Sequence, residues 1–143
     1  MDIRPYHPDD EAAVVALWDA CGLTRPWNDP RKDIRRKLAV QGDLFLVGVE
    51  DGEIIATAMA GYDGHRGWIN YLAVAPQHRR KGFGRAMMLA AERRLAAMGC
   101  PKANLQVRRT NTVAIGFYKQ LGYGLDDVVS LGKRFVRDEE APK

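Results

Sequence analysis

The sequence predicts one α/β domain in which helices flank a mixed central sheet. Apolar residues recur with helical spacing in some segments and form strand-like runs in others, so layers of helices and strands are expected around one core. Asp51-Gly52 joins two apolar runs and is a strong hairpin signal. A chain of 143 residues has the length of a single domain. We assign residues 1–136 to this domain and residues 137–143 to a polar tail.

Glycine and proline mark the ends of the expected helices. Pro8 begins the first helix and is followed by three acids, where the helix dipole favours negative charge, and Gly22 ends it. Asp29-Pro30 supplies a cap and a first-turn proline for the second helix, and Gly122 ends the last one. The expected elements are strand 2–6, helix 8–21, helix 30–40, strands 43–50 and 53–61, strand 68–74, helix 83–98, strand 103–108, helix 111–121 and one or two strands within 123–135.

The composition argues against a membrane protein and does not require a nucleic-acid partner. Hydrophobic residues make up 46% and charged residues 28% of the chain, as in ordinary globular proteins. No apolar run approaches membrane-spanning length and no secretion signal opens the chain, so we expect no export. The net charge is +4, and the basic excess is concentrated at residues 79–85 and 108–109. Because it forms no extended stripe, we expect no nucleic-acid partner.

Two cysteines, Cys21 and Cys100, lie at the expected ends of two helices. They lack metal-ligand spacing, so we expect no metal site and a reduced, cytoplasmic protein. No histidine lies near either cysteine in the sequence to support a thiolate, which makes a catalytic thiol the weaker interpretation.

The segment Arg79-Arg80-Lys81-Gly82-Phe83-Gly84-Arg85 lies between an apolar strand and a helix. Four cations at a helix N-terminus are unfavourable on their own, because the backbone there already carries about half a positive charge. Backbone N–H groups that two glycines make accessible, surrounded by cations, form an anion site. We therefore expect a phosphate or pyrophosphate here; a solvated basic turn is the alternative.

Two other phosphate-binding loops fit this segment less well. A nucleoside-triphosphate loop requires Gly-Lys followed by Ser or Thr, whereas Gly84 is followed by arginine and alanine. A dinucleotide-binding turn requires a small third residue, where this chain has Met87, and an acid after the next strand, which ends at Arg108. The pattern that remains is Arg-x-x-Gly-x-Gly, formed by Arg79, Gly82 and Gly84.

A second motif runs from Asn111 to Tyr123 and begins one expected helix and one expected strand after the first. Its residues follow Asn-x-x-Ala-x-x-Phe-Tyr-x-x-x-Gly-Phe/Tyr. The two motifs in this order resemble the GNAT superfamily of N-acetyltransferases, and the resemblance covers nearly the whole chain. It is nearest to the RimI-like branch. The peptides at residues 25–30 and 61–67 further resemble the bacterial YpeA-type proteins.

The resemblance implies the GNAT fold, with a mixed, mostly antiparallel central sheet. Acetyl-CoA, the acetyl donor, would lie between two parallel strands of this sheet that splay apart. These would be the strands ending at Val74 and Val107, whose unpaired backbone groups would bind the pantetheine arm. Asn111 would also bind that arm, or would only cap its helix. The implied cofactor-binding residues are Leu72, Ala73, Val74, Arg79, Arg80, Lys81, Gly82, Phe83, Gly84, Arg85, Asn111, Phe117 and Tyr118. Residues 72–74 are alternatively plain buried strand.

Tyr118 is the candidate catalytic residue, and the resemblance implies that it is a general acid. Transfer of an acetyl group from a thioester to an amine expels a thiolate. Because a thiol has a reference pKa near ~8.5, proton donation to the departing sulfur assists the reaction. The alternative is packing, since Ala114, Phe117, Tyr118 and Leu121 have the spacing of a core-facing helix.

No general base can be assigned from the sequence. Some relatives place a carboxylate on the strand before the phosphate loop, but residues 68–71 contain no acid. An α-amine has a pKa near ~8, so ordered water is one candidate for accepting its proton. Asp63 and His65 are the other candidates, unless they only shape a turn. Trp27 is a candidate contact for the acceptor, or it pins its own loop to the core.

Three functions follow from these observations. The first is an acetyl-CoA-dependent N-acetyltransferase that acts directly on a primary amine of a protein N-terminus, a lysine or a small molecule. The second is a GNAT fold that senses acyl-CoA without turnover. The third is a nucleic-acid binder that uses the basic loop, which leaves the Asn111–Tyr123 motif unexplained. The acceptor stays open, as does the oligomeric state, for which a homodimer is one option.

Overall fold

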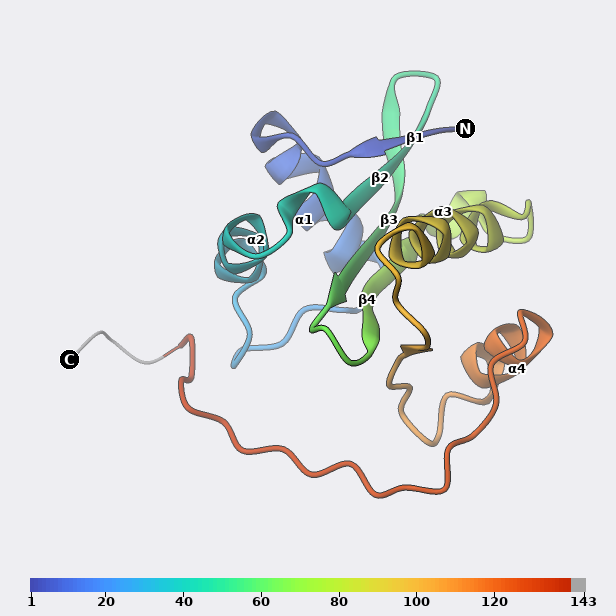
Figure 1. Ribbon diagram of the computed structural model, residues 1–143. Helices are drawn as coiled ribbons and strands as arrows, with labels where there is room; N and C mark the ends of the chain where they lie inside the picture. The colour runs from blue at the N-terminus through green and yellow to red at the C-terminus, as the bar shows by residue number, and fades with distance from the viewer. Residues whose placement is uncertain (140–143) are drawn as a thin grey trace.

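The computed structural model describes residues 1–139 and has an α/β fold (Figure 1). Its sheet has the strand order β1-β2-β3-β4-β5. Neighbouring strands are antiparallel, except that β4 and β5 pair in parallel. The strands are β1 (Asp2–Pro5), β2 (Phe45–Glu50), β3 (Glu53–Tyr62), β4 (Gly67–Val74) and β5 (Ala103–Asn104). The prediction of a mixed and mostly antiparallel sheet is confirmed.

Helices cover both faces of this sheet. They are α1 (Glu11–Ala20), α2 (Pro30–Ala39), α3 (Phe83–Ala97) and α4 (Thr112–Gln120). Trp18 of α1 contacts Thr57 of β3, whereas Met87 of α3 approaches Gly48 beside Ala56. Since successive strand residues point to opposite faces, α1 and α3 lie on opposite sides of the sheet.

The indole of Trp18 lies at the centre of the core. It is fully buried, stacks on Tyr71 with ring centroids 3.9 Å apart, and lies 5.9 Å from the ring of Phe45. Its Nε1 donates a hydrogen bond of 2.9 Å to the Thr57 hydroxyl, which in turn donates one of 2.8 Å to the Tyr71 carbonyl. The buried polar groups therefore satisfy one another, as a stable core requires.

A bulge interrupts β4 next to this core. Thr57 of β3 pairs with Ala73, and Met59 pairs with Asn70, so two residues of β4 lie opposite one residue of β3. Tyr71 takes up the extra residue with φ of 51°, in the left-handed region that non-glycine residues rarely adopt. The bulge therefore interrupts the backbone ladder between β3 and β4 at this point.

The parallel pair of β4 and β5 separates after a short contact. Gly67 pairs with Ala103 and Trp68 with Asn104, and the pairing ends there. Within the described part of the chain, residues 69–74 of β4 consequently have no strand on their β5 side. The predicted splayed pair is present, and its opening faces the end of β4 that leads into the phosphate loop.

Three sequence predictions about the elements were wrong. The first helix begins as a 3-10 turn at Pro8–Asp10 before α1. The strand expected at 103–108 ends at Asn104, and no strand forms within 123–135. Residues after Gly122 instead run as an extended segment around the body (Figure 1). Val128 and Val129 have strand propensity, but a strand also needs a neighbour to pair with, which the local sequence does not report.

The expected polar tail contacts the rest of the domain at the residues that the structure describes. Asp138 is buried and accepts a hydrogen bond of 2.7 Å from the backbone N–H of Asp29. Its carboxylate also pairs with the guanidinium of Arg36. A charge partner far away in the sequence therefore anchors residues 137–139. Residues 140–143 lie outside the described part of the chain.

Candidate active site

The predicted phosphate loop has a backbone that exposes N–H groups. Arg80 and Gly82 adopt left-handed conformations, with φ of 65° and 82°. Gly82 is the N-cap residue of α3, and no side chain within residues 1–139 caps that end. The first turn of α3 contains no acid, so its N–H groups are not neutralised. The loop therefore presents an accessible, positively polarised helix end.

The cations of this loop are exposed to solvent. Arg80, Lys81 and Arg85 are exposed. Arg79 is exposed as well, but its Nε donates a hydrogen bond of 3.2 Å to the carbonyl of Val74. That bond ties the loop to the end of β4. Arg79 thus positions the loop in this structure, while its three neighbours leave their charges available.

Gly84 marks the point where three predicted site segments meet. A Cβ placed on Gly84 would lie 3.3 Å from Cζ of Phe117 and 3.6 Å from Cγ2 of Val74. The first turn of α3 therefore contacts α4 and the end of β4 so closely that a larger side chain would have to displace Phe117. The structure brings together the two sequence motifs, which lie far apart along the chain.

Tyr118 lies on the inner side of α4 between two aromatic rings. Its ring makes edge contacts with Phe117 and Tyr123, at centroid distances of 5.1 and 5.9 Å. Burial raises the pKa of the Tyr118 phenol above its ordinary value of 10.0. The hydroxyl therefore stays protonated at neutral pH, as a proton donor must.

The side chain of Asn111 is engaged by its own helix. Its Oδ1 accepts a hydrogen bond of 3.1 Å from the N–H of Ala114, which makes Asn111 the N-cap of α4. The capping interpretation is confirmed. A second contact through its amide nitrogen stays a prediction, because the cap occupies only the oxygen.

Comparison with known proteins identifies the family. The model of the acetyltransferase (GNAT) family matches residues 12–123. The chain belongs to this family. Acetyltransferase ECA0875 of Pectobacterium atrosepticum is 49% identical over 140 residues, which cover 98% of this chain and 99% of that protein. The protein is therefore a GNAT-family acyltransferase, as the two motifs predicted.

Solved structures of GNAT acetyltransferases share the fold. Ard1 of Thermoplasma volcanium matches with a TM-score of 0.77 and 26% identity, over 87% of this chain and 83% of its own. The PaiA N-acetyltransferase of Thermoplasma acidophilum, solved in complex with coenzyme A, matches with a TM-score of 0.76 and 20% identity, over 90% and 92%. At 20% identity the likeness supports the fold alone. No helix within residues 1–139 is long and apolar enough to cross a membrane.

The predicted acceptor residues of this GNAT acetyltransferase are dispersed. Oδ1 of Asp63 accepts hydrogen bonds of 2.7 Å from the backbone N–H groups of both His65 and Arg66, which lowers the pKa of Asp63. Asp63 thus shapes its turn, and His65 is exposed on it. Trp27 is half-buried, and its carbonyl accepts bonds from Asp138 and Arg134. It belongs to the loop on which the C-terminal segment is anchored.

The structure adds a carboxylate next to β4 that the sequence reasoning missed. The hydroxyl of Tyr71 donates a hydrogen bond of 2.7 Å to Oδ2 of Asp33 on α2. Burial, together with this bond, raises the pKa of the Tyr71 phenol. Oδ1 of the same carboxylate accepts a hydrogen bond from Arg36. An acid from another element therefore lies against a residue of this strand, at the bulge where Tyr71 has a positive φ.

Proposed function

We propose that this GNAT protein is an acetyl-CoA-dependent N-acetyltransferase that transfers an acetyl group directly to a primary amine. The observation that carries the proposal is the convergence at Gly84. The uncapped N-terminus of α3, the unpaired edge of β4 and the inner side of α4 all meet there. An anion site, a backbone edge and a protonated phenol are the three parts that a thioester-bearing nucleotide donor requires.

The donor's pyrophosphate would bind to the N–H groups at the start of α3, with the charges of Arg80, Lys81 and Arg85 around it. Its pantetheine arm would run along residues 72–74, where β4 has lost its parallel neighbour. Amide groups of that arm would satisfy backbone groups that the splayed sheet leaves open. The coenzyme A complex of PaiA supports such a donor for this fold.

The chemistry assigned to the site is one acyl transfer. The amine nitrogen attacks the thioester carbonyl, an N–C bond forms and the C–S bond breaks. The Tyr118 hydroxyl donates its proton to the departing sulfur, and the amine releases a proton to water. Cys21 and Cys100 carry free thiols, and each donates a hydrogen bond of 3.4 Å to a backbone carbonyl, Cys21 to that of Val74 at the edge of the donor site and Cys100 to that of Lys102. Among the described residues, neither thiol bonds to a histidine or carboxylate that would activate it. We therefore propose direct transfer without a covalent enzyme intermediate, in the reducing cytoplasm.

The acceptor is defined here only as a primary amine, either a protein N-terminus, a lysine or a small molecule. The neighbouring acidic group is Asp33, held by Tyr71 at the β4 bulge. That carboxylate is already paired with the guanidinium of Arg36, so it does not by itself select the charge of the acceptor. Trp27, Asp63 and His65 stay as candidate contacts on the surrounding loops.

Donor binding can be tested by isothermal titration with acetyl-CoA. We expect binding to the wild-type protein and its loss in the Arg80→Glu/Gly82→Asp variant, which adds negative charge to the anion site. The matched control is Arg93→Glu/Gly99→Asp, which makes the same changes near the other end of α3, where Gly99 also has a positive φ. Equal binding by both variants, or no binding by the wild type, would contradict the proposal.

Catalysis can be tested separately with Tyr118→Phe. With a panel of primary amines, we expect kcat to fall about 10²-fold, the usual contribution of a general acid, and the Kd for acetyl-CoA to change little. Tyr123→Phe is the control, since it removes a neighbouring phenol that bonds Glu92 instead. An unchanged kcat in the Tyr118 variant would remove the general-acid role while leaving the donor site intact.

A further inference from the structure

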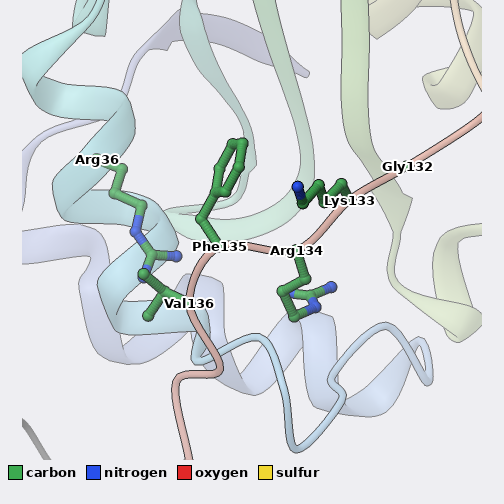
Figure 2. A pocket seen from close by; sticks show the side chains of 6 residues that line it. All are labelled: Arg36, Gly132, Lys133, Arg134, Phe135 and Val136. Carbon is green, nitrogen blue, oxygen red and sulfur yellow. The ribbon is translucent and has the colours of Figure 1, made fainter.

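An open cavity of about 580 Å³ lies between α2 and residues 132–136. Three of its lining side chains are cationic, those of Arg36, Lys133 and Arg134. Figure 2 shows the aromatic ring of Phe135 between Arg36 of α2 and Lys133. None of the described residues that line the cavity is acidic. The cavity therefore combines positive charge with apolar surface, which suits an anionic molecule that has a carbon skeleton.

Arg36 reaches this cavity from α2, and two acids share its charge. Its guanidinium donates a hydrogen bond of 2.9 Å to the carboxylate of Asp33 and pairs with the carboxylate of Asp138. The ammonium of Lys32 lies beside Asp138 as well, where it donates a hydrogen bond of 3.2 Å to the backbone carbonyl. Two cations thus accompany these two acids, so the acids leave no excess of negative charge beside the cavity.

Lys133 and Arg134 carry positive charge that no ion pair within the described chain balances. Arg134 donates its hydrogen bonds to neutral oxygens, at 2.9 Å to Oδ1 of Asn28 and at 3.3 Å to the carbonyl of Trp27. The ammonium of Lys133 forms no hydrogen bond or ion pair with the described residues. A carboxylate in the cavity would therefore gain charge-assisted hydrogen bonds without breaking an existing ion pair.

The cavity lies beside the proposed position of the acetyl group. With the donor's pyrophosphate at the start of α3 and its arm along residues 72–74, as proposed above, its thioester end lies at Tyr71. The hydroxyl of Tyr71 bonds Asp33 at 2.7 Å, and Asp33 pairs with Arg36 in the cavity wall. Two side-chain contacts therefore connect the reacting end of the donor with the cavity.

We propose that this cavity binds a carboxylate of the acceptor, so that the substrate is a primary amine that also carries an anionic group. The inference rests on the proposed acetyl transfer and adds the chemical class of the acceptor. Lys133 and Arg134 hold the carboxylate, and Phe135, whose side chain is 89% exposed, contacts the carbon skeleton. The amine then faces Tyr71. A small amino acid and a peptide with an acidic residue after its N-terminus share this chemistry.

Two pairs of amines test the proposal, because only the carboxylate is replaced by an amide within each pair. One pair is γ-aminobutyrate and γ-aminobutyramide, and the other is the C-terminally amidated dipeptides alanyl-glutamate and alanyl-glutamine. Binding is measured from the NMR shifts of the backbone amides of residues 132–136, with coenzyme A and without it. We expect the acid of at least one pair to bind about tenfold more tightly than its amide, and that pair identifies the source. Equal binding within both pairs, or no shift, overturns the proposal.

Lys133→Glu reverses a charge of the cavity without removing a hydrogen bond or ion pair of the described chain. We expect this variant to lose the preference for acid over amide in binding and in kcat/KM, mainly through a higher KM. Arg93→Glu makes the same charge change at an exposed position on α3 and should keep the preference. Both side chains are exposed, so both variants should fold normally. A Lys133 variant that discriminates like the wild type overturns the carboxylate site.

Failure of this inference differs from failure of the proposed function. If acids and amides are acetylated with equal kcat/KM, the carboxylate site is wrong and the acetyl transfer stands. If the protein does not bind acetyl-CoA in the titration described above, the acetyltransferase proposal is wrong. The amide shifts of residues 132–136 decide the carboxylate site in either case, because they do not depend on turnover.

Discussion

Residues 1–98 and residues 99–139 are built in different ways. Within the described chain, every buried apolar side chain lies at or before Leu95, and Asp138 is the one buried side chain beyond it. The first region holds β1–β4 and α1–α3 around Trp18. The second holds β5, α4 and residues 124–138, which we call the C-terminal strap. These parts attach through polar contacts and half-buried side chains such as Phe117. Stability is thus concentrated in the first region.

The proposed donor site lies where these two regions meet. The first region supplies the cations, the start of α3 and the edge of β4, and the second supplies Phe117 and Tyr118. A donor that contacts both regions would hold α4 against α3 more firmly than the apolar contacts alone. Ligand binding to the folded state stabilises it by mass action, so acetyl-CoA should protect the second region most.

The largest expected effect is a difference in unfolding free energy between a variant in the first region and one in the second. Trp18→Ala removes a fully buried indole and its hydrogen bond to Thr57, and we expect the free energy of unfolding to fall by about 3–5 kcal/mol. Val113→Ala, at an 84% exposed position on α4, should change it by less than about 0.5 kcal/mol. Urea denaturation measures both. If the two substitutions lower the free energy of unfolding by similar amounts, stability is not concentrated in the first region.

The next effect concerns the contact that joins the regions. Gly84→Val places methyl groups where the Phe117 ring lies, since even a Cβ would lie 3.3 Å from it. Because α4 buries little, it should shift rather than unfold the core. We expect the Kd for acetyl-CoA to rise about tenfold, or about 1.4 kcal/mol, by calorimetry. Gly124→Val is the control, since no atom lies within 4 Å of a Cβ added there. If the two variants bind acetyl-CoA with equal affinity, the contact between Gly84 and Phe117 does not shape the site.

The first region was also the more predictable from sequence. The hairpin at Asp51-Gly52 and the helix ends at Gly22 and Asp29-Pro30 depend on local chemistry, so short patterns located them. Residues 123–135 show the limit. Their β-branched residues Val128 and Val129 favour strands, yet the partner that would pair with them is not encoded nearby. The anchor of Asp138 on Arg36 joins positions too distant for any local pattern.

The candidate site likewise has one part that was predictable from the sequence and one part that was not. The anion loop could be predicted, because four cations before an uncapped helix violate the usual dipole preference whatever the tertiary structure. The meeting of Asp33 with Tyr71 could not, because it depends on a bulge that turns Tyr71 to a positive φ. Asp63 illustrates the converse, since a residue that looks catalytic in sequence forms a turn here.

A smaller effect tests whether α4 has a local stability of its own. Gly116→Ala replaces a mid-helix glycine whose added Cβ contacts nothing, so helix propensity alone should stabilise α4 by about 0.5–1 kcal/mol. We expect slower hydrogen exchange of the α4 amides and little change in exchange of the core strands. Gly99 has a φ of 85°, which alanine adopts unfavourably, so Gly99→Ala should instead destabilise the end of α3 and speed hydrogen exchange there. A uniform slowing over the whole chain would show that the two regions unfold together.

The smallest effect concerns the far end of the strap. Hydrogen bonding to Arg36 is the main cause that lowers the pKa of Asp138, with the Asp29 N–H contributing. Because the pKa is lower in the folded state, this contact stabilises the anchor above the ordinary carboxyl pKa of about 4 and is lost as the pH falls through the lowered value. Asp138→Ala should therefore remove protection of the Asp29 amide at neutral pH and change the global free energy of unfolding by less than about 0.5 kcal/mol.

Amide exchange of Asp29, followed by NMR across acidic pH, checks this prediction. The wild type should be protected at neutral pH and should converge on the Asp138→Ala variant as the carboxylate is protonated. Glu139→Ala, next to Asp138 in the chain, should leave the Asp29 amide unchanged. If the Asp29 amide stays protected in the Asp138 variant, the strap is held by its other contacts.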